Sequence, residues 1–292
     1  MCPGTDRCHR WWWIPASDSP TALKRDSPTC WCSATMSRPP LPPELLDHVV
    51  DFLHDSSDAL QSCCLVSKSW IPRTRKHIFA NIDFQFVEDL QSWKTVFPDP
   101  STSPARYAKT MCTGCPRVLT ALAAKEGCWV SAFSRIVDLN MNIVRRIGEN
   151  KVISLVPFHG FSPVLKSLDI LYSDIPPSKI FKFICSFPLL EDVSLHTMDH
   201  SLTERPMVVQ PSSSPVFTGS LRVRHEAGIG PIASRLLSLP GGLRFRRLCL
   251  LLCCKADISI ATALVENCSC TLEFIYVDTR IFGTSVLHLC PH

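Results

Sequence analysis

A short apolar motif that returns six times along the chain constrains its fold more than any other feature. The spacing apolar-x-x-apolar-x-apolar occurs at 136–141, 165–170, 190–195, 245–250 and 272–277, with a weaker copy at 218–223. The central residues are Leu139, Leu168, Val193, Leu221, Leu248 and Ile275, and subtracting their numbers gives separations of 29, 25, 28, 27 and 27. Chance produces one or two such matches, whereas six at a near-constant period indicate a repeated structural unit.

Between the copies lie stretches with helical spacing, so we expect each unit to contain one strand and one helix. In "PSKIFKFICSF", Ile180, Ile184 and Phe187 share one helical face. The stretch "DISIATALVENCS" begins with Asp257, which we expect to be its N-cap. A period of this length with one strand and one helix per unit resembles the leucine-rich repeat, whose units stack to bury their single apolar faces.

The units depart from regular leucine-rich repeats. The Asn or Cys that such repeats carry behind the strand is present only at Cys253. The last expected strand (272–277) is followed by no helical pattern that would complete its unit, which indicates a truncated C-terminal end. We therefore expect an irregular, leucine-rich-repeat-like α/β solenoid over residues 131–292, and an α+β class for the whole chain.

The composition restricts the class of protein. A hydrophobic content of 46% with 19% charged residues is typical of a globular protein. A net charge of +4 without a Lys/Arg block argues against nucleic acid as a partner. The 16 cysteines could suggest a secreted disulfide framework, but the N-terminus has no signal-type apolar run, and the run at 248–254 is too short to span a bilayer. We expect a reduced protein of the cytoplasm or nucleus without a membrane partner.

Two segments are expected to lie outside the repeats. Residues 1–37 read as a poorly ordered arm, and Met36 is an alternative start that would make the arm a gene-model extension. Residues 83–130 read as a linker with a Pro-rich loop at 97–105 and a helix at 118–127.

Between the arm and the linker, residues 38–82 predict three short helices. The stretch "PELLDHVVDFLH" places Leu45, Leu46, Val49, Val50 and Leu53 on one helical stripe, which follows Pro42 and Pro43. Ser56 or Ser57 is expected to cap a second helix, and "RTRKHIFANIDF" forms the third element. Three helices in about forty residues have little core of their own, so an outside surface is needed to cover the apolar stripe.

The same stretch resembles an F-box. It starts with Leu41-Pro42 and Glu44, continues with the apolar helix, and closes with "LVSKSW", in which Trp70 is the last residue. The rest of the chain is similar to mushroom-type fungal F-box proteins in "SLVPFHGFSPVLKSLDI" and "ICSFPLLEDVSL".

This resemblance implies a partner and a role. F-box modules bind the Skp adaptor and, through it, the cullin of an SCF ubiquitin ligase, while the following repeats hold a protein substrate. Such a subunit is not an enzyme and needs no cofactor. Carried over by position, the residues that would form or support the adaptor face are Leu41, Pro42, Leu45, Leu46, Val49, Leu53, Leu60, Leu65, Val66 and Trp70. The alternative is that Leu45, Val49 and Leu53 pack on the protein's own repeats.

Other patterns point less clearly to chemistry. Cys112 and Cys115 form a C-x-x-C motif, but a zinc site needs four ligands and a redox site needs a strand–motif–helix context, against which the preceding prolines argue. His159 and His196 read as loop or repeat-surface residues. Arg244 and Arg246 would share a strand face that could suit an acidic or phosphorylated ligand, but a solvated face is the preferred interpretation.

The sequence contains no G-x-S-x-G, H-E-x-x-H or Gly-rich phosphate loop, so we expect neither catalysis nor metal binding. The preferred hypothesis is a substrate receptor of an SCF ubiquitin ligase. Two alternatives remain open: a repeat scaffold or degenerate F-box relic outside any ligase, and a small cysteine-rich redox or metal protein.

Overall fold

The computed structural model describes residues 42–124, 129–144, 155–159, 161–173, 175–197, 217–225, 229–239, 242–279 and 286–289. Pro43–His292 forms one compact unit, which contains every helix and strand given below. The predicted arm, the alternative start at Met36 and the first predicted contact residue, Leu41, lie outside the described residues.

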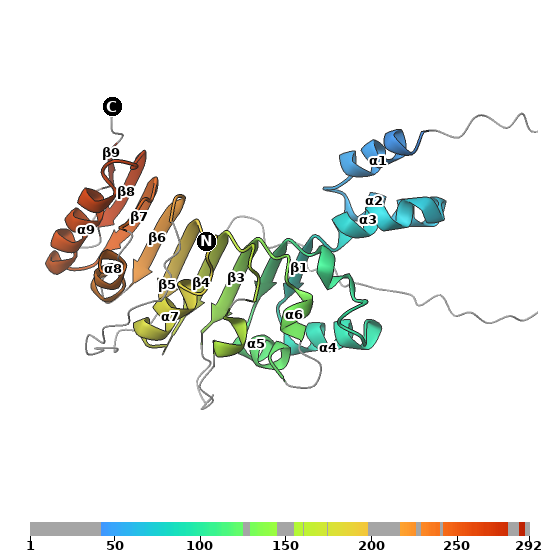
Figure 1. Ribbon diagram of the computed structural model, residues 1–292, viewed down its shortest axis with the longest axis horizontal. Helices are drawn as coiled ribbons and strands as arrows, with labels where there is room; N and C mark the ends of the chain where they lie inside the picture. Colours follow the sequence, from blue (N-terminus) through green and yellow to red (C-terminus); the bar gives the residue numbers. More distant parts are fainter. Residues whose placement is uncertain are drawn as a thin grey trace, which may run out of the picture. The chain divides into compact units, whose positions relative to one another are not determined.

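The described residues form a mixed α+β structure around a single sheet, in which each strand lies beside the next one along the chain (Figure 1). The first eight strands are parallel and the ninth is antiparallel to its neighbour. The strands are β1 (Asn81–Phe84), β2 (Thr110–Thr113), β3 (Asp138–Ile143), β4 (Ser167–Tyr172), β5 (Asp192–Thr197), β6 (Ser220–His225), β7 (Arg247–Leu252), β8 (Phe274–Thr279) and β9 (Val286–Leu289).

The register of this sheet confirms the strand motif found in the sequence. Each central residue pairs directly with the next one across the sheet, in the order Leu139, Leu168, Val193, Leu221, Leu248 and Ile275. The row is buried as far as Leu248, and Ile275 is partly buried. The motif thus marks one continuous apolar row inside the sheet.

The predicted linker at 83–130 is part of the same sheet. The apolar row continues from Leu139 to Met111 on β2 and Ile82 on β1, with separations of 28 and 29 by subtraction of these numbers. This segment also carries α4 (Val87–Val96), η2 (Pro104–Tyr107), α5 (Pro116–Leu122) and α6 (Trp129–Ala132). The linker prediction was therefore wrong, and the helix expected to reach Gly127 ends at Leu122.

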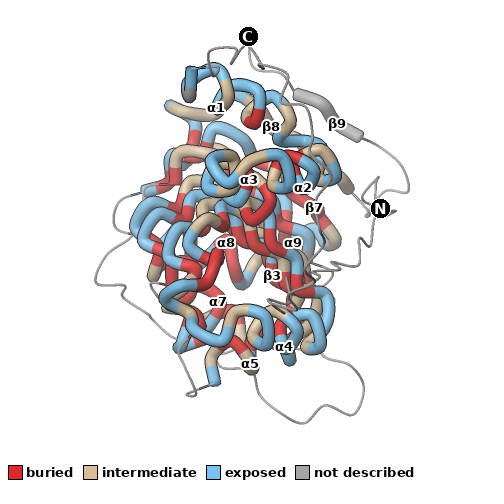
Figure 2. The backbone as a smooth tube through the Cα atoms, turned by 90° about the vertical axis from the view of Figure 1, so that its right-hand side faces the viewer, coloured by how far each residue is buried: buried red, intermediate tan, exposed pale blue. Residues whose placement is uncertain are grey.

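All the crossover helices lie along one side of the sheet (Figure 1). They are α4, α5 and α6, followed by α7 (Pro177–Ile184), α8 (Gly230–Leu237) and α9 (Lys255–Cys268), with the short η3 (Val156–Phe158) between β3 and β4. Parallel strands in sequential order require every crossover to advance in the same direction, and the right-handed rule then places every helix on the same face. Figure 2 shows the buried residues running between the strands and these helices.

Among the described residues, no crossover helix lies on the other face of the sheet, and we call this the open face. Along β3, Leu139, Met141 and Ile143 are buried, whereas Asp138 and Asn140 are exposed. The period of two in a strand sends alternate side chains to opposite faces, so the polar residues occupy the open face.

Three helices precede the sheet: α1 (Pro43–Phe52), α2 (Ser57–Val66) and α3 (Ile71–Ile78), with η1 (Lys68–Trp70) between the last two. We call them the helical module. The predicted cap at Ser56 is confirmed, since its side chain accepts a hydrogen bond from the Ala59 amide at 3.4 Å. The core of the module has four buried apolar side chains, Val50, Leu60, Ile78 and Phe79.

Two local expectations were wrong. Asp257 is not the N-cap of α9: Cys254 holds that position, and the Asp257 carboxylate bonds back to the Cys254 amide from the third helical position. The strand predicted at 245–250 begins at Arg247, so Arg244 and Arg246 precede it. Within the described ranges, no helix combines the length and apolar character that crossing a bilayer requires.

Candidate interaction surfaces

Helix α1 has two apolar stripes rather than one. Leu46, Val50 and Leu53 turn toward the other helices and are buried or half-buried. The second stripe, Leu45, Val49 and Phe52, recurs at the same helical spacing and is exposed, with Phe52 87% accessible. The outer stripe contributes nothing to the module's own core.

The end of α2 adds two further apolar side chains to the exposed surface of the module. Leu65 is 89% exposed and Val66 is 69% exposed. Of the eleven large hydrophobic residues exposed in the described part of the chain, five lie between Leu45 and Val66. We call these five residues, Leu45, Val49, Phe52, Leu65 and Val66, the module's apolar surface. Such a concentration is typical of an interface, because single exposed apolar residues are normally scattered.

The residues predicted to form or support an adaptor face divide into three groups. Pro42 and four members of the apolar surface are exposed, while Leu46, Leu53 and Trp70 are partly buried. Leu60 is only 1% exposed and belongs to the module's core, where it can support a face but not form it. The alternative that Leu45 and Val49 pack on the protein's own repeats is wrong, since both are exposed.

Phe52 is absent from the residues predicted to form the adaptor face, because the predicted helical stripe ended with Leu53 and did not include the residue before it. Its spacing of seven from Leu45 was the available signal, since residues seven apart lie on the same side of a helix.

A polar clamp fixes the outer stripe of α1 relative to α3. The carboxylate of Asp51 accepts two hydrogen bonds from the Arg73 guanidinium, one of them from Nε at 2.6 Å. His77 Nε2 lies 2.7 Å from the same carboxylate. The bonds from Arg73 and His77 hold the pKa of Asp51 well below its ordinary value. The clamp therefore keeps Asp51 ionised and sets the orientation of α1.

The open face of the sheet changes charge along its length. One transverse row runs through Asp83, Cys112, Asn140, Asp169, Ser194, Arg222, Cys249 and Tyr276. Acidic residues lie in its first half, at β1 and β4, whereas the second half carries Arg222 on β6 and an aromatic residue on β8. A ligand on the second half of the face therefore meets positive charge beside an aromatic ring.

At the middle of this row, Asp169, Ser194 and His196 lie close together without forming a catalytic triad. Ser194 Oγ is 2.8 Å from His196 Nε2, and Asp169 Oδ1 is 3.6 Å from the same nitrogen. A triad requires the acid and the serine on opposite ring nitrogens. Burial is the main cause that lowers the pKa of His196, which Arg224 and Arg222 lower further and Asp169 raises. His196 lies on the strand surface, as the sequence predicted.

Beside this cluster, the open face forms a hollow of about 280 Å³ across β6, β7 and β8. Its lining includes Arg222, Arg224, Cys249, Phe274, Tyr276 and Asp278. These two arginines were not among the residues considered from the sequence, which included Arg244 and Arg246 as a less favoured possibility for an acidic ligand. The available signal was the alternation in "SLRVRH", which sends Leu221 and Val223 to the core and both arginines to the other face.

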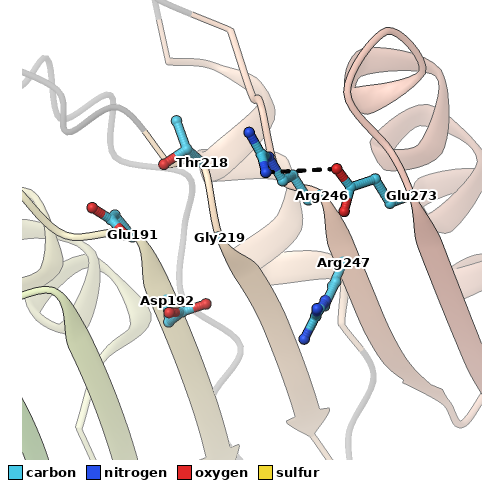
Figure 3. Close-up of a pocket in the computed structure, with 7 residues that line it drawn as sticks. All are labelled: Glu191, Asp192, Thr218, Gly219, Arg246, Arg247 and Glu273. Atoms are coloured by element: carbon cyan, nitrogen blue, oxygen red, sulfur yellow. Dashed lines mark ion pairs between the residues drawn. The ribbon is translucent and has the colours of Figure 1, made fainter.

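A second hollow, of about 370 Å³, lies at the amino ends of β5 to β8 (Figure 3). Two of its charged groups, Asp192 and Arg246, have polar partners nearby. Asp192 accepts hydrogen bonds from the amide and hydroxyl of Ser220 at 2.6 and 2.7 Å, and Arg246 lies 3.6 Å from Glu273. A carboxylate thus already faces the guanidinium of Arg246, which makes this arginine a weaker candidate for binding an acidic ligand.

The C-x-x-C motif lies between a strand and a helix, contrary to the expectation that this context was missing. Cys112 belongs to β2, and Cys115 is the N-cap residue of α5. Burial, reinforced by Asp83, raises the pKa of Cys112 to about 11, so the nucleophilic thiolate is scarce at neutral pH. Across the residues described, no three His, Cys, Asp or Glu side chains are grouped to hold a metal ion.

Comparison with known proteins adds no relative. No protein-family model matches the chain, and no curated protein matches its sequence. The F-box resemblance therefore depends on the quoted motifs and on the surface described above.

Proposed function

We propose that the chain is the substrate-receptor subunit of an SCF ubiquitin ligase in the cytoplasm or nucleus. In this proposal residues 38–82, which include the helical module, are an F-box that binds the Skp adaptor and, through it, the cullin. The sheet and its helices are an irregular leucine-rich-repeat-like solenoid that binds a protein substrate. The subunit is not catalytic: it holds the substrate near ubiquitin that other subunits deliver, so its contribution is proximity.

The observation that carries the proposal is the apolar surface on a module with a very small core. Four buried side chains give the module little stability of its own, while five large apolar side chains remain in water. Covering a Phe or Leu side chain contributes ~1.5–3 kcal/mol, so a partner on this surface gains substantially from the hydrophobic effect. Four of the residues carried over from the F-box motif, Leu45, Val49, Leu65 and Val66, belong to this surface.

The sheet supports the second half of the proposal. Its strands follow one another at separations of 25 to 29 residues, measured between paired central residues, and the crossovers lie on one side. This arrangement is what stacked repeats produce, and it leaves one long polar face free for a protein ligand.

The test is the affinity of the full chain for a fungal Skp adaptor, measured by pull-down and by titration. The variant Phe52→Ala/Leu65→Ala removes the two most exposed side chains of the apolar surface. At ~1.5 kcal/mol or more for each side chain, we expect an affinity loss of about 100-fold or greater. A second variant, Leu41→Ala/Pro42→Ala, tests the start of the F-box motif and should also bind more weakly.

A matched control removes two exposed apolar side chains elsewhere. Leu189 and Ile258 are 51% and 44% exposed, so Leu189→Ala/Ile258→Ala should bind the adaptor as the wild type does. Circular dichroism of each variant establishes that it is folded. A folded wild type that does not bind the adaptor would refute the receptor proposal and favour the alternative, a repeat scaffold or F-box relic outside any ligase.

A further inference from the structure

Within the described part of the chain, two arginines on the open face have no acidic partner. Arg222 and Arg224 are alternate residues of β6, so their side chains leave the same face of the sheet. Both are exposed, and among the described residues no carboxylate lies within ion-pair distance of either guanidinium. Asp169 on β4 faces His196 instead. Asp278 on β8 lines the same hollow, two strands away from Arg224. The positive charge of this strand is therefore available to a ligand.

The hollow next to these arginines has an apolar side. Phe274 and Tyr276 on β8 are partly exposed and line it together with both arginines. Cys249 lies between Arg222 and Tyr276 in the same transverse row, so the cations and the rings are two strands apart. The Asp278 carboxylate lies at the end of the hollow that holds the two rings. A ligand that fills the hollow therefore needs negative charge at the arginine end and an uncharged apolar group at the ring end.

We propose that this hollow binds an extended acidic segment of a partner protein. Aspartate or glutamate side chains of the segment pair with Arg222 and Arg224, and a following apolar side chain packs on Phe274 and Tyr276. The charge complementarity is specific, because a guanidinium pairs with a carboxylate through two parallel hydrogen bonds. The inference rests on the proposed function only in identifying this segment as part of the ligase substrate.

The strand geometry sets the spacing of the groups in the segment. Alternate residues of a strand lie ~6.6 Å apart, so two acidic residues separated by one residue match the two arginines. Neighbouring strands lie ~4.8 Å apart, so β8 is ~10 Å from β6, which three residues of extended peptide span. The predicted pattern is acidic-x-acidic-x-x-apolar.

The experiment measures binding of the full chain to a fluorescein-labelled peptide by fluorescence anisotropy. The probe contains Asp-Gly-Asp-Gly-Gly-Leu between Gly-Ser flanks. A second peptide replaces both aspartates by asparagine, and a third replaces them by phosphoserine. The variant Arg222→Gln/Arg224→Gln removes the proposed partners. The control Arg135→Gln/Arg244→Gln removes the same charge from two exposed arginines outside the hollow.

We expect the aspartate peptide to bind the wild type and the control equally, with at least a tenfold loss in Arg222→Gln/Arg224→Gln and a similar loss for the asparagine peptide. Equal binding by all three proteins, equal binding of the asparagine peptide, or no binding of the aspartate peptide would overturn the inference. Binding of the phosphoserine peptide alone would replace the carboxylate by a phosphate and overturn the stated ligand class.

The same variants separate this inference from the proposed function. Arg222→Gln/Arg224→Gln should keep its affinity for the Skp adaptor, and Phe52→Ala/Leu65→Ala should keep its affinity for the aspartate peptide. A wild-type chain that binds the adaptor but not the aspartate peptide would refute only the acidic ligand, and one that binds the peptide but not the adaptor would refute only the ligase assignment.

Discussion

Phe79, directly after α3, packs edge-on against Trp93 of α4, with ring centroids 5.7 Å apart and planes at 86°. Trp93 makes a second edge-on contact with Phe84 of β1, at 5.8 Å. One indole ring therefore joins the small core of the helical module to the core of the sheet. The module depends on this contact, because the rest of its core cluster is Val50, Leu60 and Ile78, with Cys63 buried outside that cluster.

The first prediction concerns this link. Phe79→Ala removes a buried ring and leaves a cavity, which costs about 3–5 kcal/mol. The module should lose its amide protection against hydrogen exchange, whereas β3 to β7 should keep theirs because their core does not contain Phe79. Phe86→Ala is the matched control, since Phe86 is 55% exposed. Uniform loss of protection over the whole sheet would contradict the claim that Phe79 stabilises the helical module rather than the sheet.

The second prediction is a pH-dependent loss of the clamp between α1 and α3. The pKa of Asp51 is lowered by its bonds to Arg73 and His77, so the ionised carboxylate stabilises the folded chain. This stability is fully present above the unfolded pKa of about 3.9 and is lost as the pH falls below it. Asp51→Asn should therefore lower the Tm at pH 7, and the difference from wild type should shrink below about pH 4.

The control for this prediction is Asp47→Asn. Asp47 lies one turn earlier on α1, and its carboxylate is 4.0 Å from Arg73 in a more exposed position. Exposed pairs of this kind contribute little, so the variant should melt close to the wild type. A Tm difference for Asp51→Asn that is unchanged between pH 7 and pH 3 would show that the clamp does not act through ionisation.

The sequence predicted the strands from β3 to β8 because five copies of the motif have three apolar residues at one spacing and the copy at β6 has two. The sheet keeps the central residues of these copies in one row. The prediction missed β1 because Ile82 was assigned to the third helical element, although Phe79, Ile82 and Phe84 keep the motif's spacing. It missed β2 because Thr113 holds the last position of "AKTMCT", where the motif needs an apolar residue. Burial there alternates as in the longer strands, so tertiary pairing decides what the local pattern leaves ambiguous.

The candidate surfaces were predictable in part. The F-box motif pointed to α1 and α2, but only the packing separates Leu45 and Val49, which are exposed, from Val50, which is buried. Alternation in β6 could have shown that its two arginines share a face. The alignment of Arg222 with Tyr276, two strands away, depends on the register of β6, β7 and β8. No local sequence pattern contains that information.

The third prediction concerns Asp257, which is 2% exposed and accepts three backbone hydrogen bonds. Its Oδ1 accepts from the Ile229 amide at 2.9 Å, and its Oδ2 accepts from the Cys253 and Cys254 amides at 2.9 and 3.1 Å. Asp257→Ala leaves these donors without a partner and should destabilise the fold by about 3 kcal/mol. Asp257→Asn should be nearly as damaging, because its amide group offers only one acceptor oxygen to two sets of donors.

Chemical denaturation with urea measures these changes, with Glu266→Ala on the exposed side of α9 as the control. If Asp257→Asn were as stable as the wild type, one oxygen would suffice, and the carboxylate would not be the link between the start of α8 and the start of α9.

The fourth prediction links the acidic ligand to the protonation of His196. Burial lowers the pKa of His196, as do Arg224 and Arg222, while Asp169 on β4 opposes them. The imidazole is therefore neutral at pH 7, and it becomes a third cation beside the arginines only when the pH falls below its lowered pKa. A bound acidic segment favours this cation, so binding takes up a proton and tightens as the pH falls.

The measurement is the anisotropy titration of the aspartate peptide between pH 7.5 and about pH 5, where the peptide carboxylates stay ionised. Wild-type affinity should rise through this range. His196→Gln should remove the rise without weakening binding at pH 7.5, because the neutral imidazole adds no charge there. The control is His159→Gln, since burial and Lys182 lower the pKa of His159 away from the open-face hollow. A rise of the same size in His196→Gln would assign the proton uptake to another group and refute the role of His196.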